Sequence, residues 1–378
     1  MTETQDDRVP VTLLTGFLGS GKTTLLNHLL RDPHAGRIAV IMNEFGDVGL
    51  DHDLIEEVTE DIVLMHAGCL CCSIRGDLAK TMVHLLSRKK RGELTFERVV
   101  IETTGIADPG PILNTMVTDR MIAPYFRADG VVTLADAATG PHTLDTQFEA
   151  VSQVAMADLI VLTKTDLVTA DALERFEERL EGINGSARRV TAEHGRLPGG
   201  TLFGLSAMHR SATAEDVADW LGARNAEEDQ AGGIPSGELR KSAPTSPPEI
   251  QTQPTTQHDH RIASATIEVA HPIPARVLDA WLDTLMARRG PDILRMKGIA
   301  HVEGMKWPVV FHGVQHIFTA PLPLKSWSGN NTTTRVVVIG RDLDVEDLKA
   351  SLEPLRRRPE EVDVYAEGMM AHATEMPF

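Results

Sequence analysis

The stretch GFLGSGKT, residues 16–23, limits the possible folds of this chain more than any other part of the sequence. It fits G-x-x-x-x-G-K-[ST] at every fixed position, directly after a strand-like run and at the start of a helical pattern. In this context the glycines let the backbone approach phosphate oxygens, and the helix N-terminus supplies positive potential. The motif therefore predicts a phosphate-binding loop. The alternative is a glycine-rich strand–helix turn without a ligand.

From residue 11 to about 222, apolar strand-like runs alternate with helical patterns. Several runs are continuous in Val, Ile and Leu, as strands buried on both faces are. This alternation predicts an α/β fold, a P-loop NTPase with a mostly parallel sheet covered by helices on both sides. The expected strands are VTLLTG (11–16), IAVIMNE (38–44), DIVLMHA (61–67), RVVIETTG (98–105), GVVTLADA (130–137) and LIVLTKTD (159–166).

The chain divides into four parts by composition: a P-loop domain over 1–222, a linker over 223–260, a second domain over 261–357 and a tail over 358–378. The linker is rich in Pro, Ser, Thr and Gln and holds too few large apolar residues to fold. The second domain is predicted to be a smaller α+β unit with a mostly antiparallel sheet. Its expected elements are a helix over 274–289, strands over 298–304, 309–318 and 334–340, and a last helix over 344–357.

The acidic composition argues against nucleic-acid binding, because the formal net charge is −17 and phosphate contacts need clustered Lys and Arg. The first residues, MTETQDDRVP, lack the pattern of a signal peptide, and no apolar run reaches membrane-spanning length. All three cysteines lie in one window, which argues against a disulfide framework. We therefore expect a cytoplasmic protein with neither nucleic-acid nor membrane partners.

Two catalytic residues are predicted, Lys22 and Glu102. Lys22 is placed to reach the β- and γ-phosphates, and the Thr23 hydroxyl to bind Mg²⁺. Glu102 ends a neighbouring strand and is assigned to the magnesium water shell or to positioning of the attacking water. Gly105 is expected to lie near the γ-phosphate and to move when it is hydrolysed. The predicted nucleotide-binding residues in and near the loop are Gly16, Phe17, Leu18, Gly19, Ser20, Gly21, Lys22, Thr23, Thr24 and Gly105.

The run LTKTD at residues 162–166 predicts that the nucleotide is GTP. The stem of Lys164 can lie along a purine, and Asp166 can accept two hydrogen bonds from guanine, whereas adenine offers neither donor. Thr163 completes this predicted base site. Asp136 ends the preceding strand and is a second acidic candidate, or a residue that only caps a turn.

These motifs together resemble the CobW family of P-loop GTPases, whose members act as metallochaperones or metal-insertion factors. The resemblance rests on TGFLGSGKTTLLNHLL, NEFGDVGLD, GCLCCSIRGDL, IETTGIADPGP and LTKTDL in the family's order, and on LRMKGI, HGVQHIF and VVVIGRDL further on. It implies a GTPase that uses Mg²⁺, carries Zn²⁺ or Co²⁺ as cargo and serves a client metalloprotein. It also leaves a homo-oligomer open.

The resemblance makes the cysteine window a metal site, with Cys69, Cys71, Cys72 and Asp47 as predicted ligands. Thiolates select zinc, cobalt or copper over magnesium. Closely spaced cysteines cannot all bind one ion easily, so His66, a water or a second protein would complete the shell. An inert cysteine cluster and a redox pair remain alternative interpretations, as do a metal buffer or sensor and a thiol switch for the whole protein.

Four features bear on these expectations. Met42 stands where the family often has a glutamate ligand, and Thr163 where its guanine motif often begins with Asn. His258 and His260 form a short version of a His-rich tract, which we interpret as part of a solvated linker. His312 and His316, four apart, are interpreted as a surface histidine pair.

Overall fold

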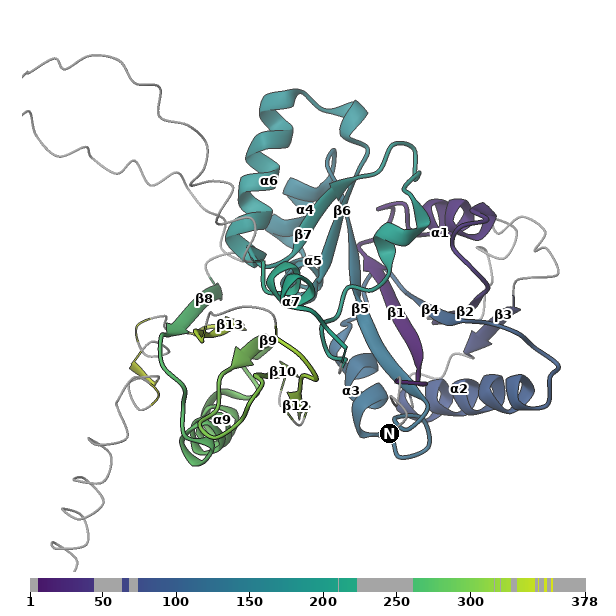
Figure 1. Ribbon diagram of the computed structural model, residues 1–378. Helices are drawn as coiled ribbons and strands as arrows, with labels where there is room; N and C mark the ends of the chain where they lie inside the picture. The colour runs from purple at the N-terminus through teal and green to yellow at the C-terminus, as the bar shows by residue number, and fades with distance from the viewer. Residues whose placement is uncertain are drawn as a thin grey trace, which may run out of the picture.

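The structure is a computed structural model, and it describes residues 6–43, 63–67, 74–209, 211–222, 261–315, 317–319, 321–327 and 332–343, with positions 346, 350, 351 and 355. Within these ranges the chain forms two sheets, each with its own helices (Figure 1). The predicted tail and linker lie outside the described residues, as does nearly all of the helix expected over 344–357.

The first sheet confirms the predicted P-loop NTPase fold. It has seven parallel strands in the order β3-β2-β4-β1-β5-β6-β7. The strands are β1 (Val9–Gly16), β2 (Ile38–Asn43), β3 (Val63–Ala67), β4 (Arg98–Thr103), β5 (Phe126–Asp136), β6 (Leu159–Thr163) and β7 (Arg188–Thr191). Its helices are α1 (Lys22–Arg31), α2 (Ile74–Lys90), α3 (Gly110–Thr118), α4 (Gly140–Thr146), α5 (Phe148–Met156), α6 (Ala170–Asn184) and α7 (Ala214–Trp220), with two short 3₁₀ turns, η2 (Thr165–Leu167) and η3 (Gly199–Leu202).

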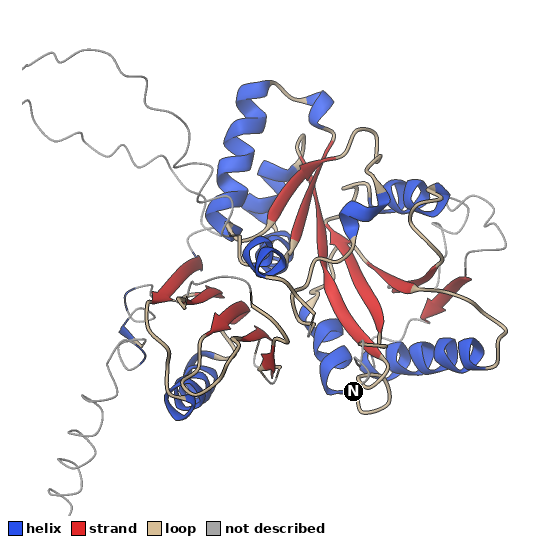
Figure 2. Ribbon diagram, in the orientation of Figure 1, coloured by secondary structure: helices blue, strands red, loops and turns tan. Residues whose placement is uncertain are grey.

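Alternating side chains bury both faces of this sheet, as Figure 2 illustrates with helices on either side of the red strands. On β1, Leu13 belongs to the apolar cluster that α2, α3, α5 and α6 complete, and Leu14 belongs to the cluster under α1. Strand β7 was not expected from the sequence. Its RRVT segment is half-buried or exposed at the sheet edge, so it lacks the apolar run that marks the inner strands.

The second sheet is antiparallel in every described pairing, as expected. Its strands are β8 (Ile262–Val269), β9 (Ile293–Ala300), β10 (Val309–Val314), β11 (Ile317–Phe318), β12 (Leu322–Pro323) and β13 (Thr334–Arg341), and its helix is α9 (Ala275–Arg289). Strand β9 begins at Ile293, earlier than the predicted 298–304. The prediction placed its start too late because Arg295 and Lys297 look like exposed residues in the sequence, although both are buried.

The second sheet lies between α9 and the first domain. Met296 and Phe311 face α9, whereas Val310 and Val314 join the core cluster of the first domain. Helices α3, α5 and α6 contact β10, β9 and β8 respectively, and Figure 1 shows the green and yellow strands on this side of the first domain. Apolar side chains of both domains thus share one core cluster, which opposes free movement of the two domains.

Candidate functional site

The predicted phosphate loop joins β1 to α1, with three glycines at positive φ: Gly16 at 140°, Gly19 at 77° and Gly21 at 98°. Gly16 cannot be replaced without a shift, because a Cβ there would lie 2.6 Å from the carbonyl oxygen of Leu134. These conformations favour glycine and turn the loop tightly around the start of α1. The loop therefore has the shape that the motif predicts.

Lys22 is the first residue of α1, and its side chain turns back onto the phosphate loop. Its Nζ donates to the carbonyl oxygen of Gly16 at 2.8 Å and to that of Phe17 at 3.3 Å, and the residue is only 9% exposed. The ammonium is thus held close to where phosphate oxygens would pass the loop amides. Phosphate oxygens are stronger acceptors than carbonyls for a charged donor, so they can compete for it.

Thr23 and Glu102 meet across the strand–helix boundary. The Thr23 hydroxyl donates to Glu102 Oε1 at 3.2 Å, and Glu102 is buried at the end of β4. Hydroxyl and carboxylate oxygens suit Mg²⁺, whose oxygen ligands at about 2.0–2.1 Å lie about 3 Å from one another in an octahedron. Ser20 Oγ and Thr104 Oγ1 nearby are buried and have no hydrogen-bond partner among the described residues. This donor set fits magnesium and phosphate oxygens.

The TKxD segment is attached directly to the phosphate loop. Thr163 Oγ1 donates to the carbonyl oxygen of Ser20 at 2.9 Å, and Lys164 Nζ donates to that of Gly19 at 2.9 Å. A threonine hydroxyl therefore suffices at this position to tie the two segments together, although the family often has Asn. Asp166 follows on η2 and is exposed, so its carboxylate is open to a base.

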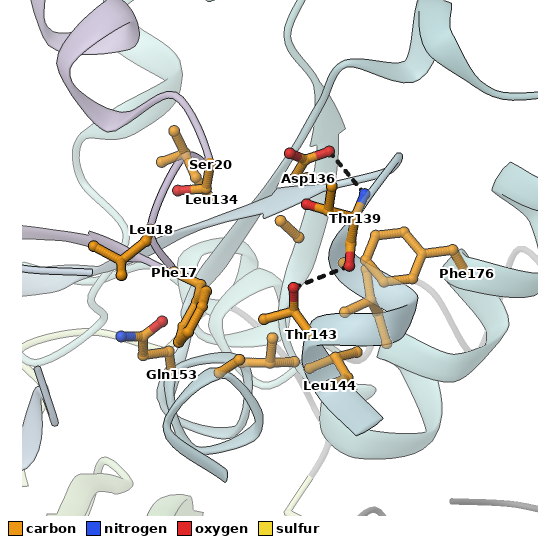
Figure 3. A pocket seen from close by; sticks show the side chains of 15 residues that line it. Phe17, Leu18, Ser20, Leu134, Asp136, Thr139, Thr143, Leu144, Gln153 and Phe176 are labelled. Atoms are coloured by element: carbon orange, nitrogen blue, oxygen red, sulfur yellow. Dashed lines mark hydrogen bonds between the residues drawn. The ribbon is translucent and has the colours of Figure 1, made fainter. Parts of the chain in front are cut away.

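Asp136 caps a turn and pairs with Lys164. Its Oδ1 accepts from the backbone N–H of Ala138 at 2.8 Å and from that of Thr139 at 3.2 Å, the second of which Figure 3 draws. Its Oδ2 accepts from Lys164 Nζ at 2.7 Å. Burial alone would raise the pKa of Asp136, but the hydrogen bonds from Lys164 and the turn outweigh it and lower the pKa. Of its two predicted roles, the capping role is the one that these contacts favour.

A mainly apolar pocket lies beside the phosphate loop (Figure 3). Phe17 and Leu18 of the loop line one side, and Phe176 of α6 lies opposite them. Gln153 of α5 also lines the pocket and donates from Nε2 to the carbonyl oxygens of Gly105, at 3.1 Å, and Ala107, at 3.0 Å. Gln153 was not predicted from the sequence, although a glutamine within the apolar run AVSQVAM is a signal for a buried polar contact.

The segment after β7 was missed as well. Ala192 N–H donates to the carbonyl oxygen of Leu162 at 2.8 Å, which places the segment beside the TKxD strand. Gly195, at φ 76°, packs so closely on α1 that a Cβ would lie 2.8 Å from the side chain of Thr24. The exposed Thr24 thus lies against this loop, and the loop borders the predicted base site. The turn signal in EHGR was available in the sequence.

The predicted metal ligands Asp47, Cys69, Cys71 and Cys72 lie outside the described residues, as do the side chain of His66 and residues His258 and His260. Within the described part of the chain, no three His, Cys, Asp or Glu side chains are grouped as metal ligands would be. In the sequence, the cysteine window lies between β3 and α2. Strand β3 runs parallel to β2, so it ends on the side of the sheet where the carboxyl ends of the strands and the phosphate loop lie.

Met42 is part of the core. It is 4% exposed, lies opposite Glu102 in the β2–β4 register and belongs to the apolar cluster that includes Leu25 and Leu26 of α1. A carboxylate at this position would be buried next to Glu102, which disfavours its charged form. Methionine therefore packs here as an ordinary core residue.

The prediction of a surface histidine at 312 was wrong, and His316 lies outside the described residues. His312 is 7% exposed and faces the first domain from β10. Burial first, and then the charge of Arg295, lower its pKa to about 3, with Lys297 acting in the same direction and Asp158 opposing. The segment VVFHGVQ does not show in the sequence which face of the strand another domain covers, so the burial of His312 could not be predicted.

His312 borders a buried ion cluster between the domains. Arg295 donates to both carboxylate oxygens of Asp158, at 2.7 and 2.8 Å, and Lys297 Nζ lies 2.8 Å from Asp158 Oδ1. Lys297 also donates to the carbonyl oxygen of Trp220 at 3.0 Å. Burial alone would raise the pKa of Asp158, but the two cations lower it to about 2. The cluster therefore stays ionised and fixes β9 against the first domain.

Comparison with known proteins agrees with this geometry. Residues 10–191 match the family described as CobW/HypB/UreG, nucleotide-binding domain, and residues 262–356 match the cobalamin synthesis protein CobW C-terminal domain. Both matches fall on the two sheets described above. No helix in the described ranges is long and apolar enough to cross a membrane.

One relative and one solved structure are similar to most of the chain, and a second relative is similar to half of it. The zinc chaperone YjiA of Escherichia coli is 33% identical over 92% of this chain and 99% of its own. A crystal structure of Zn(II)-bound YjiA GTPase from E. coli has a TM-score of 0.67 and 29% identity, covering 93% of this chain and 99% of that one. The zinc-regulated GTPase metalloprotein activator 1 of Schizosaccharomyces pombe is 38% identical over 50% of this chain and 47% of its own.

Proposed function

This chain belongs to the CobW family of P-loop GTPases, and we propose that it couples GTP hydrolysis to the delivery of a divalent transition metal to a client metalloprotein. Zinc is the favoured cargo and cobalt the second, because thiolates prefer such ions. The names of the relatives, a zinc chaperone and a zinc-regulated activator, support the same choice.

GTP hydrolysis is assigned to Lys22, Thr23 and Glu102. Lys22 neutralises charge on the β- and γ-phosphates. Thr23 and Glu102 would hold Mg²⁺, which would supply further charge neutralisation and orient the phosphates. The other role proposed for Glu102 is to position the attacking water. Stabilisation of the transferring phosphoryl group is electrostatic, so no covalent enzyme intermediate is required.

Base selection is assigned to Asp166, with Thr163 and Lys164 holding the segment on the phosphate loop. The exposed Asp166 carboxylate can accept from guanine N1–H and the exocyclic amine. Adenine would leave this carboxylate without either donor, which is the kind of mismatch that gives strong discrimination. GTP is therefore the proposed nucleotide.

The cargo site is assigned to Cys69, Cys71 and Cys72, with Asp47 as an additional ligand. One observation carries the link between cargo and nucleotide: β1, β3 and β4 are parallel strands of one sheet, so the chain enters the cysteine window at the edge that holds the phosphate loop. A γ-phosphate at that edge can order adjacent segments, and its loss can release them.

The test combines metal analysis with turnover. Reduced protein should bind one Zn²⁺ per chain, and GTP hydrolysis should respond to metal or client. The Cys71→Ser/Cys72→Ser double variant should lose metal binding but keep nucleotide binding. Lys22→Ala should keep metal binding but lose nucleotide binding. Stoichiometric zinc with no effect of metal or client on turnover would favour a buffer. Reversible thiol oxidation that changes nucleotide affinity would favour a redox switch.

A further inference from the structure

The segment 104–109 connects the predicted magnesium ligand Glu102 to α3. It begins with a turn in which Ala107 N–H donates to the carbonyl oxygen of Thr104 at 3.1 Å. Gly105 lies directly against the phosphate loop, since a Cβ there would be 2.5 Å from the backbone nitrogen of Leu18. Any displacement of this segment therefore changes the surroundings of the predicted γ-phosphate position.

Two glutamines hold the segment from opposite domains. Gln153, 1% exposed on α5, donates to the carbonyl oxygens of Gly105 and Ala107. Gln315, in the second domain, donates from Nε2 to Asp108 Oδ2 at 3.0 Å. The other carboxylate oxygen of Asp108 accepts from Gly110 N–H at 2.9 Å, at the start of α3. The segment is thus anchored at its middle by the first domain and at its end by the second.

The backbone at Gln315 belongs to the tight turn between β10 and β11. The residue follows β10 with φ 52°, a left-handed conformation that is unfavourable for residues other than Gly, Asn and Asp. Its amide lies against the backbone of Gly110, where a Cβ would come within 2.5 Å of Gln315 Nε2. The buried pairing of Arg295 with Asp158 fixes the neighbouring strand β9, so the amide is presented at a defined place.

We propose that Gln315 is a positioning residue of the GTPase site: acting through Asp108, it lets the second domain set the position of Gly105 relative to the γ-phosphate. This inference rests on the proposed GTPase function and on the predicted place of Gly105 beside the γ-phosphate. Only GTP carries the phosphate that reaches this segment, so the contact affects GTP and GDP differently. By linkage, GTP and GDP also differ in how they stabilise the domain contact. The second domain thereby senses the nucleotide.

The test uses the full chain without added transition metal. Affinities for GDP and a non-hydrolysable GTP analogue are measured for the wild type and for Gln315→Ala, with single-turnover hydrolysis of GTP. We expect Gln315→Ala to change the GTP-to-GDP affinity ratio at least about fivefold and to slow single turnover, while the GDP affinity stays within about twofold. Arg288→Ala is the control, because Arg288 is exposed on α9, on the far side of the second sheet.

A donor–acceptor exchange separates positioning from a merely structural role. Gln315→Glu places a carboxylate against Asp108 and should be worse than Gln315→Ala. Adding Asp108→Asn should rescue it, because the amide introduced by the second substitution can donate to the carboxylate introduced by the first. The oxygen of that amide still accepts from Gly110 N–H.

An unchanged affinity ratio in a folded Gln315→Ala variant would overturn the proposal, as would an equal loss for both nucleotides or a failure of the exchange to rescue. If zinc affinity of the wild type were the same with GTP and GDP, only the proposed metal delivery would be contradicted, since the Gln315 test contains no transition metal.

Discussion

The substitution Asp158→Asn tests the buried ion cluster that joins the domains. Asp158 is 6% exposed and faces two buried cations, Arg295 at 4% and Lys297 at 1%. The substitution keeps the shape and the acceptor for Val131 N–H but removes the only negative charge of the cluster among the described residues. Two buried cations would then lack a counter-charge.

The magnitude follows from burial. The lowering of the Asp158 pKa from 3.8 to about 2 corresponds to about 2 kcal/mol in favour of its ionised form. Removing one partner of a buried ion pair typically costs about 3–5 kcal/mol, because the remaining charge stays desolvated. We expect Asp158→Asn to lower the free energy of unfolding within this range, a large part of the stability of an ordinary domain.

Urea denaturation followed by circular dichroism and tryptophan fluorescence measures the change, and Trp220 lies at the cluster as a local probe. Asp342→Asn is the matched control, because Asp342 pairs with Arg261 at an exposed site where solvent screens the charge. The double variant Asp158→Asn/Lys297→Met should recover part of the loss by removing one unpaired cation. Equal small losses for Asp158→Asn and Asp342→Asn would refute the reasoning.

Three further results are expected. The pKa of His312 is about 3 in the folded chain and about 6.5 in the unfolded chain, so the folded state loses stability as the pH falls below about 6.5. Urea denaturation should show a loss of about 2 kcal/mol in the free energy of unfolding between about pH 7 and pH 5, and His312→Asn should lack this loss. The same pH dependence in the wild type and in His312→Asn would contradict this. Asp166→Asn should weaken GTP and favour xanthosine nucleotides in a fluorescence binding assay, whereas equal wild-type affinity for ATP and GTP would remove the guanine assignment. Lys22→Ala should abolish GTP turnover in a phosphate-release assay by removing charge stabilisation, and an unchanged rate would place the activity elsewhere.

Much of the first domain could be predicted because its signals are local. The motif GFLGSGKT and the apolar runs of the inner strands depend on nearby residues alone, and the spacing of LTKTD after a strand predicts a base site with Thr163 and Lys164. Their structural reason, attachment to the carbonyl oxygens of Ser20 and Gly19, required the folded sheet. The edge strand β7 has no such local signal, because its side chains stay partly exposed.

The contacts between domains could not be predicted, since they depend on pairing over long sequence distances. Arg295 and Lys297 look like surface residues of a strand until Asp158 is placed opposite them. Gln315 looks like an ordinary turn residue until Asp108 is brought beside it. A single sequence shows which strand positions alternate, but not which face another domain will cover.

The most direct test of the whole account is a zinc competition titration of the reduced chain with Mg²⁺, once with a non-hydrolysable GTP analogue and once with GDP. Coupling between two sites typically changes affinity about 5- to 150-fold. We predict that Zn²⁺ binds more tightly with the GTP analogue, by a factor in this range, and that the Cys71→Ser/Cys72→Ser variant loses the difference. Identical zinc affinity in the two nucleotide states would contradict GTP-driven metal delivery.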